Sequence, residues 1–496
     1  MNIRFVTTDP AVHYLLASYF SETGRLLLRV NNLIAYEGLS SYPFLAYSNT
    51  GLLMSFVESS VSKIAIYLIS NILIYFFLIL TLFSIYSKFV KKVDFLQTTI
   101  IIIIAAAGYN FNSIIFGFTS QMAGVLLVLT IILINESIEN KKVKILLLTL
   151  NMVGLFFAYY YFIPAAMIAF VLSDLIDQRN FNYKSIMKNI LSMQNIIVCG
   201  VTFICGVSYL LIFNNKELSS DISAIASEGY IYRDLYSNFK PYLIFAVLSF
   251  SLWIREKRTS SIFIFTLIYV LLTLGLLYMG MRGEVSSYYY FKNYYLLENL
   301  FILLFVIGLN YTKIRFRALY FSIVSIICIL GLTSVFLDKP IQQKNLLFNV
   351  ELERNVTKIQ NFNKETAINM TTIFNEKQRG FMDRIVKNKT VYLEGSNYIP
   401  VVGDLLQQLW FYSYTEIWPK YNSNALSSFY EDPILDYKKW KNDLNKNPYL
   451  ILFDSMSSEE WSKKENIDLN DFDVIVKVEG AVLLRLKEAS ISNNME

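Results

Sequence analysis

The sequence has few charges, few glycines and prolines, and a single histidine. Charged residues make up 17% of the 496 residues, against about a quarter in soluble globular chains, which argues against a wholly soluble protein. With only 19 glycines and 9 prolines, collagen-like and low-complexity architectures are excluded. The formal net charge of +5 is too small to favour a protein that binds nucleic acid.

Cysteine and histidine are scarce enough to restrict what the C-terminal part can be. All three cysteines precede residue 338, so residues 338–496 do not form a disulfide-built domain. The only histidine is His13, which excludes a histidine-based hydrolase in that part. A long domain without cysteine suits a bacterial envelope better than a eukaryotic secretory compartment.

Hydrophobic residues are abundant instead, at 54%, and the charges are unevenly spread, because residues 338–496 hold 43 of the 83 acidic and basic residues. The apolar part shows no strands of alternating polarity, and only helices or closed barrels satisfy the backbone inside a bilayer. The sequence therefore predicts a polytopic α-helical membrane protein at 61–337, followed by an α/β domain at 338–496.

The membrane part contains several apolar runs near the length of about 20 residues that a crossing needs. They lie at about 61–87, 113–135, 195–213, 261–279, 289–309 and 318–337, with a shorter one at 239–254. Two further stretches, 93–108 and 145–176, are ambiguous by length alone.

Five basic clusters between the runs predict the topology, because short loops rich in Lys and Arg stay in the cytoplasm. They lie at 88–92, 141–144, 179–188, 255–258 and 313–317. If all five clusters lie inside, 93–135 forms a hairpin, and 145–176 forms a second one that is broken near Tyr159–Tyr161 and Pro164. This predicts about ten crossings, with residues 1–60 and 338–496 both extracytoplasmic. A single unbroken helix at 145–176 would reverse the orientation of everything that follows.

The N-terminal segment carries the first candidate site. Asp9 precedes Pro10, a pattern typical of a helix start, and His13 lies one turn later on the same face. Gly24 predicts the end of this helix. Asp9 is either a helix cap beside a histidine at a polar interface or a functional acid tuned by His13. A divalent cation held by Asp9, Glu22 and His13 is an alternative with a weak motif.

The stretch TTDPAVHY, its continuation SETGRL and the later Tyr42-Pro43 resemble the acidic first outer loop of the GT-C superfamily of membrane glycosyltransferases. The resemblance implies a polyprenyl-phosphate sugar donor, many helices of uneven length, and Asp9 as the catalytic acid. In that family a transmembrane helix precedes this loop. Residues 1–60 contain no such run, so we expect an upstream helix that the sequence lacks.

A second candidate site lies in the outer turn and helix entrance around 280–295. Lys292 and Arg282 could hold the donor phosphate, since cations stabilise the charge that grows on a leaving group. Nearby residues, and one in the loop at 214–238, are candidate substrate contacts: Tyr289, Tyr290, Glu284 and Arg233. The competing interpretation is an interfacial aromatic belt. Glu298, deeper in the helix, is expected to face protein rather than lipid.

The C-terminal domain shows strand candidates at Thr390–Glu394, Tyr449–Phe453, Asp473–Val478 and Ala481–Leu486, with helices at about 402–414 and 434–446. This alternation predicts a small α/β unit with a partly parallel sheet. It could bind the acceptor or support the outer loops.

The predicted function is transfer of a sugar, with inversion, from a polyprenyl-phosphate donor to a glycan, lipid or protein of the cell envelope. A transporter or flippase of lipid-linked oligosaccharides is the alternative from another class. Such proteins usually carry internal repeats or charges along a membrane path, and neither is seen. A polysaccharide polymerase is a third candidate.

Overall fold

The computed structural model divides the chain into two compact units. The terminal unit comprises Met1–Tyr42, Tyr47–Ile69 and Ala367–Glu496, and the bundle unit comprises Pro43–Ala46 and Ser70–Thr366. The structure describes residues 3–4, 9–25, 43–58, 60–89, 117–177, 190–213, 240–256, 261–282, 287–336, 372–392, 399–402, 405–415, 448–453 and 469–487, with single positions between 98 and 113. Each unit is described separately below.

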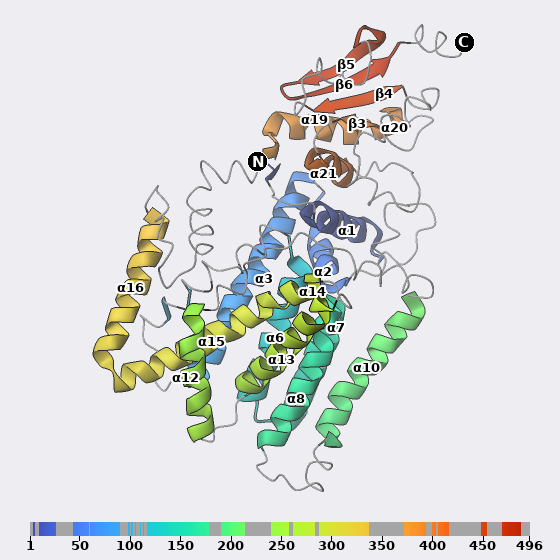
Figure 1. The fold of residues 1–496 in the computed structure, drawn as a ribbon. Coiled ribbons are helices and arrows are strands. Elements are labelled where there is room, and N and C mark those ends of the chain that lie inside the picture. Colours follow the sequence, from blue (N-terminus) through green and yellow to red (C-terminus); the bar gives the residue numbers. More distant parts are fainter. Residues whose placement is uncertain are drawn as a thin grey trace. The chain divides into compact units, whose positions relative to one another are not determined.

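The bundle unit consists of helices, coloured from blue to yellow in Figure 1. They are α3 (Ser60–Phe89, which begins in the terminal unit), α6 (Thr119–Ser137), α7 (Lys141–Tyr159), α8 (Ile163–Asp177), α10 (Met193–Phe213), α12 (Lys240–Glu256), α13 (Ser261–Met281), α14 (Ser287–Lys292), α15 (Tyr294–Arg315) and α16 (Arg317–Phe336). Most coincide with the predicted apolar runs. The 93–108 run lies largely outside the described residues.

Several of these helices are suited to a bilayer. Within the described ranges, five helical stretches are long and apolar enough to cross a membrane: Ser62–Phe89, Thr119–Ser137, Lys141–Leu175, Ser261–Met281 and Tyr289–Lys313. Three shorter apolar helices accompany them, at Met193–Tyr209, Phe245–Ile254 and Arg317–Ile326. The chain is therefore a multi-pass membrane protein, and the number of ten crossings stays a prediction.

The predicted break in the 145–176 stretch is present. Helix α7 ends at Tyr159, a turn of 3-10 helix covers Tyr160–Phe162, and α8 begins at Ile163. Pro164 stands at the second position of α8, where a missing N–H breaks no helical hydrogen bond. Gly124 of α6 faces the break, and a Cβ there would lie 2.6 Å from the Cβ of Tyr159.

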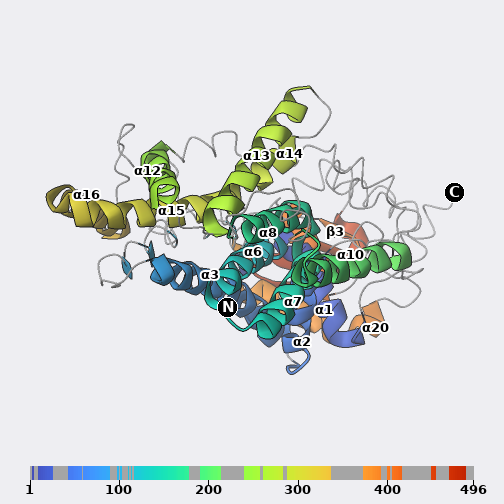
Figure 2. The same cartoon turned by 90° about the horizontal axis from the view of Figure 1, so that it is seen from below.

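The helices of the bundle unit pack in neighbouring pairs. Helix α6 packs on α7, α7 on α10, α8 on α13, and α12 on α15, and the view in Figure 2 shows α6, α7 and α8 gathered together. Gly308 lets α15 approach α12, since a Cβ there would lie 2.6 Å from the carbonyl oxygen of Phe245. The hydroxyl of Ser249 donates to the carbonyl of Leu304 across the same contact, at 2.6 Å.

The terminal unit joins the beginning of the chain to its end. Strand β1 (Ile3–Arg4) pairs antiparallel with β2 (Thr372–Phe374). Its helices are α1 (Asp9–Thr23), most of α2 (Leu45–Met54), the start of α3, α19 (Glu376–Lys387), α20 (Lys389–Tyr392) and α21 (Leu405–Thr415). Helix α2 was not predicted from the sequence.

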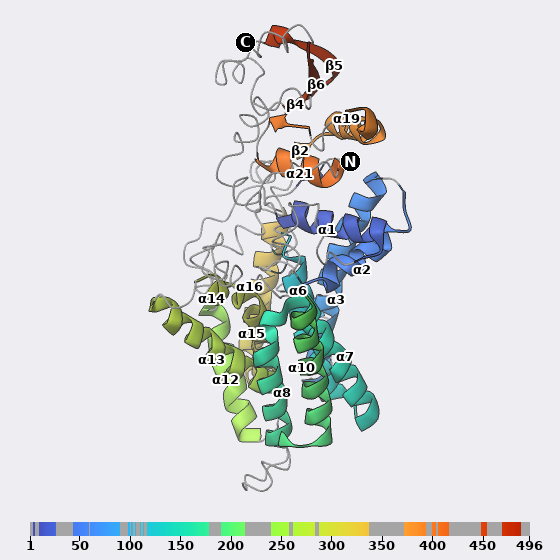
Figure 3. The same cartoon turned by 90° about the vertical axis from the view of Figure 1, so that its right-hand side faces the viewer.

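The C-terminal sheet has the strand order β3-β4-β6-β5, from Val401–Val402, Tyr449–Phe453, Ala481–Leu486 and Phe472–Val478. Strands β3 and β4 are parallel, whereas β4–β6 and β5–β6 are antiparallel, so the partly parallel sheet is confirmed. Figure 3 shows β4, β5 and β6 together with α19 and α21. Gly480, with φ +83°, makes the turn between β5 and β6.

One predicted strand is wrong. Residues Lys389–Tyr392 form the short helix α20 instead of the start of a strand at Thr390–Glu394. The backbone N–H groups of Val391 and Tyr392 donate to the carbonyl of Asn388, and the amino group of Lys389 donates to the carbonyl of Thr415 at 3.1 Å. These contacts outweigh the modest strand preference of Thr, Val and Tyr. The predicted helix at 434–446 lies outside the described residues.

Candidate functional site

Helix α1 begins at Asp9 and ends at Thr23, as predicted. Pro10 has no N–H to leave unpaired in the first turn. Gly24 adopts φ +62°, the left-handed conformation that ends many helices, and its N–H donates to the carbonyl of Phe20 at 2.9 Å. The first candidate site is therefore carried by a helix that the local sequence defines at both ends.

His13 lies one turn after Asp9 and is 4% exposed. Its neighbours on α1 are also buried, at Ala11, Val12, Tyr14, Leu15, Leu16 and Ala17, whereas Glu22 and Thr23 at the end of the helix are exposed. The side chain of Asp9 lies outside the described residues. The pairing of Asp9 with His13 therefore stays a prediction.

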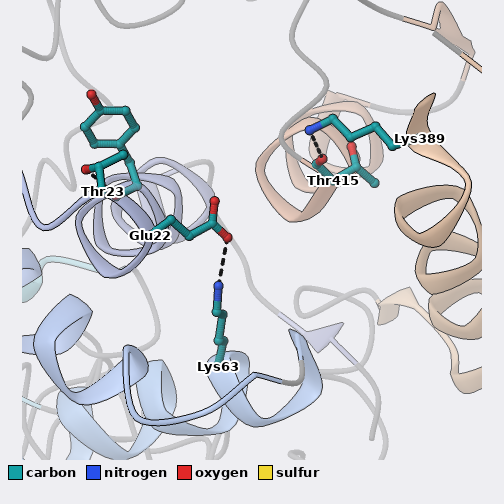
Figure 4. A network of polar contacts seen from close by, with 6 residues as sticks. Glu22, Thr23, Lys63, Lys389 and Thr415 are labelled. Atoms are coloured by element: carbon teal, nitrogen blue, oxygen red, sulfur yellow. Dashed lines mark hydrogen bonds and ion pairs between the residues drawn. The ribbon is translucent and has the colours of Figure 1, made fainter.

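Glu22, the second carboxylate of this segment, forms an ion pair with Lys63 at the start of α3. The amino nitrogen of Lys63 lies 2.8 Å from Oε1 of Glu22, and Figure 4 shows the two side chains pointing toward each other. Among the described residues, no group of three or more His, Cys, Asp and Glu side chains could hold a metal ion.

Lys292, the main cation of the second candidate site, is the last residue of α14 and is 9% exposed. Its amino nitrogen lies 3.3 Å from the centroid of the Phe118 ring, a cation–π contact. The sequence predicted an apolar helix at about 289–309 with Lys292 near its entrance. In the structure α14 ends at Lys292 and α15 begins at Tyr294, with Asn293 between them in a helical backbone conformation, and the lysine is buried in protein.

Side chains from other elements donate to backbone carbonyls next to Asn293, and the side chain of Asn293 donates to one on α13. The side-chain amide of Gln121 on α6 donates to the carbonyl of Lys292 at 2.7 Å, and the hydroxyl of Tyr161 donates to that of Tyr289 at 3.4 Å. The side-chain amide of Asn293 donates to the carbonyl of Tyr269 at 3.1 Å. Sequence reasoning missed Phe118, Gln121 and Asn293, because they are ordinary residues until the fold brings them together.

Two of these side chains keep unused acceptors. The amide oxygens Oε1 of Gln121 and Oδ1 of Asn293 are buried and accept no hydrogen bond from the part of the chain that the structure describes. Buried carbonyl-type oxygens are normally satisfied by protein, water or a ligand. The neighbourhood of Lys292 thus offers a cation together with acceptors for hydroxyl groups.

The other predicted residues of this site differ in position. The rings of Tyr289 and Tyr161 have centroids 4.9 Å apart, and Tyr289 and Tyr290 are both half-buried. Arg282 is exposed at the end of α13, with its guanidinium carbon 4.5 Å from the centroid of the Tyr278 ring. Glu284 and Arg233 lie outside the described residues.

Further buried polar groups occur along α15 and its neighbours. Glu298 is 2% exposed, which confirms that it faces protein. The side-chain amides of Asn110 and Asn299 exchange two hydrogen bonds, at 2.9 and 2.8 Å. The hydroxyl of Thr119 donates to Oδ1 of Asn71 on α3 at 2.7 Å.

The geometry can be compared with known proteins. No family model matches the chain, and no curated protein matches it. Solved structures do. ArnT from Cupriavidus metallidurans in the apo state has a TM-score of 0.54 at 11% identity, covering 97% of this chain and 94% of that one. ArnT bound to undecaprenyl phosphate has a TM-score of 0.52 at 10% identity, with the same coverage.

The apo oligosaccharyltransferase from Archaeoglobus fulgidus matches with a TM-score of 0.51 at 11% identity, covering 93% of this chain and 67% of that one. The chain has the GT-C fold. The GT-C fold was the expectation drawn from the first loop and the uneven helices, and it is confirmed. At these identities the likeness concerns the path of the backbone, so the roles of individual side chains are argued below from this chain alone.

Proposed function

We propose that the protein is an inverting glycosyltransferase that moves a sugar from a polyprenyl-phosphate donor to an acceptor of the cell envelope, at the outer face of the membrane. The GT-C fold, which both ArnT and the oligosaccharyltransferase share, carries this proposal. The ArnT structure with undecaprenyl phosphate bound supports a polyprenyl donor. The acceptor is a glycan, a lipid or a protein.

Asp9 is the proposed general base. Its carboxylate takes the proton from the acceptor hydroxyl while the hydroxyl oxygen bonds to the anomeric carbon. The bond between that carbon and the donor phosphate oxygen breaks, and its electron pair stays on the phosphate. Attack from the side opposite the leaving group inverts the anomeric centre. A positioned base contributes about 100- to 10,000-fold to such a rate, and His13 is proposed to orient or tune Asp9.

Lys292 is proposed to bind the donor phosphate, with Arg282 as a second cation. Lys292 is buried against the Phe118 ring, and a cation in a site of low dielectric stabilises the departing phosphate more strongly than one in water. The acceptors on Gln121 and Asn293 are suited to the sugar hydroxyls. Tyr289, Tyr290, Glu284 and Arg233 are proposed as further substrate contacts.

A divalent cation is an alternative to direct base catalysis by Asp9. Asp9 and His13 would be its ligands from this chain, and it would polarise the acceptor hydroxyl. Chelation separates the two mechanisms. Transfer by membranes treated with EDTA is expected to persist if Asp9 acts directly, and to fall and return with added Mg²⁺ or Mn²⁺ if a cation is required.

The function is tested with membranes that contain the protein and radiolabelled polyprenyl-phosphate sugars. Wild type is expected to transfer label to envelope material, and Asp9→Asn to lose transfer while accumulating normally. Glu22→Gln is the matched control, since it neutralises a carboxylate on the same helix that pairs with Lys63; its rate is expected to stay within a few-fold of wild type. Equal transfer by Asp9→Asn and wild type would end the assignment of Asp9. Flipping of the donor without transfer would favour the flippase alternative.

A further inference from the structure

The N-terminal strand fixes the chain just before Asp9 to the C-terminal part of the protein. Ile3 is paired with Phe374, and Arg4 with Thr372, in the antiparallel β1–β2 ladder. Strand β2 leads directly into α19, whose start carries a capping box between Asn375 and Gln378. The backbone that precedes α1 is thus attached to residues more than 360 positions later.

A second attachment lies on α1 itself, after Asp9. The ring of Tyr14, 1% exposed, lies between two aromatic rings. One is Tyr67 of α3, with its centroid at 5.8 Å, and the other is Trp410 of α21, at 5.7 Å. Trp410 is fully buried, so this is a core contact. In Figure 1, α1 and α21 lie next to each other.

The two attachments meet in one aromatic core. The ring of Phe453 on β4 lies 4.9 Å from that of Phe374 on β2 and 6.0 Å from that of Phe411 on α21. Phe411 is the residue after Trp410. Contacts therefore run without interruption from β1 through this core to Tyr14. Asp9 lies between β1 and Tyr14 in the chain.

We infer that the C-terminal domain holds α1, the helix that carries the proposed catalytic base, in place. Trp410 is then a positioning residue for Asp9. This inference rests on the proposed function for its catalytic part. The contact of Tyr14 with Trp410 holds α1 five residues after Asp9, so the entropy of positioning this helix is met on folding rather than during the reaction. A displacement of about 1 Å at a reacting group lowers a rate by about 100-fold.

The experiment compares variants of the full-length protein in membranes and in detergent. Trp410→Ala removes the ring that contacts Tyr14, and Trp410→Phe keeps an aromatic ring there. Tyr392→Leu is the matched control, because it removes a ring pair with Tyr449, at 5.3 Å, that involves the C-terminal domain alone. Should Trp410→Ala fail to accumulate, Trp410→Leu takes its place.

Trp410→Ala is expected to lower kcat about 10- to 100-fold with the donor KM unchanged, because Lys292 is untouched. Trp410→Phe is expected to restore most of kcat. Hydrogen exchange, measured independently of activity, is expected to show faster exchange of the α1 amides at 9–23 in Trp410→Ala, while β4 and β6 stay protected. Tyr392→Leu is expected to leave both kcat and α1 exchange as in wild type.

Other outcomes overturn the inference. If Trp410→Ala keeps the wild-type kcat although its α1 amides exchange faster, the contact of Trp410 with α1 does not serve catalysis. If the α1 amides exchange as in wild type, the C-terminal domain does not hold α1. An equal loss of kcat in Tyr392→Leu would indicate general destabilisation. If wild type transfers no sugar at all, the proposed function fails, and the exchange measurement still decides whether the C-terminal domain holds α1.

Discussion

The amino nitrogen of Lys292 lies 3.3 Å from the centroid of the Phe118 ring, so the residue that precedes α6 contacts the last residue of α14. Gln121, three residues after Phe118, donates to the carbonyl of Lys292 at 2.7 Å. Side chain and backbone of the lysine are thus both held by the start of α6. A cation fixed in this way needs little reorganisation when an anion binds, which is the property that favours catalysis of charge-separating reactions.

The first prediction concerns the charge of Lys292. Lys292→Gln is expected to lower kcat for sugar transfer about 100- to 1,000-fold, the range found when one stabilising donor is removed from a developing anion. Lys313→Gln is the matched control, since Lys313 is another basic residue of the following helix, with its amino group 5.6 Å from the centroid of the Tyr320 ring. Transfer by both variants is measured with labelled donor in membranes. Equal rates for Lys292→Gln and wild type would remove Lys292 from the mechanism.

The second prediction concerns the ring beneath the cation. Cation–π contacts contribute about 0.5 to 2 kcal/mol, so Phe118→Leu is expected to lower kcat/KM for the donor about 2- to 30-fold. Phe118→Tyr keeps the π face and is expected to stay near wild type. If Phe118→Leu and Phe118→Tyr behave alike, the ring contributes packing and does not orient Lys292.

The third prediction concerns stability within the bundle unit. The side-chain amides of Asn110 and Asn299 exchange two hydrogen bonds in a buried site. Asn299→Ala leaves the Asn110 amide buried without this partner, which is expected to cost about 1 to 3 kcal/mol. Asn151→Ala is the control, because among the described residues that half-buried amide bonds only the carbonyl of Leu147 one turn back. Thermal unfolding in detergent measures both.

The double variant sharpens this third test. With both amides replaced, neither partner is left unsatisfied, so the loss in Asn110→Ala/Asn299→Ala is expected to be smaller than the sum of the two single losses. Strict additivity would mean that the two amides do not stabilise each other.

Local sequence signals predicted those features that neighbouring residues determine. Asp9, Pro10 and Gly24 define α1 because capping and left-handed backbone conformation act within a few residues. Pro164 predicted the start of α8 for the same reason. The apolar runs predicted the helices, since the bilayer imposes one length and one composition on all of them.

Features that depend on distant residues were not accessible from the sequence. Gln121 and Lys292 are 171 residues apart, so the enclosed position of the lysine and its contact with α6 require the fold. The strand predicted at Thr390–Glu394 was wrong, because the amino group of Lys389 donates a hydrogen bond to the carbonyl of Thr415 on α21, a contact that the local sequence does not indicate. The contact of Tyr14 with Trp410 likewise joins two helices that no local pattern connects.

The fourth prediction concerns the pH dependence of an ion pair in the terminal unit. The amino group of Lys377 on α19 lies 2.5 Å from Oε2 of Glu479, beside the β5–β6 turn. The hydrogen bond from Lys377 lowers the pKa of Glu479, and the same bond raises the pKa of Lys377.

A lowered glutamate pKa stabilises the fold above the pH at which the unfolded residue titrates, and this contribution is lost as the pH falls through the folded pKa. A raised lysine pKa stabilises below the unfolded pKa and is lost as the pH rises through the folded one. The difference in Tm between wild type and Lys377→Met is therefore expected to be largest near neutral pH, to shrink as the pH falls below the ordinary glutamate pKa, and to shrink as the pH rises above the ordinary lysine pKa. Both side chains are exposed, so the difference in Tm is expected to be small. It is expected to shrink further in 1 M NaCl, where the Debye length falls to about 3 Å. A difference in Tm that is independent of pH and salt would show that the methylene groups of Lys377, rather than its charge, stabilise this corner of the sheet.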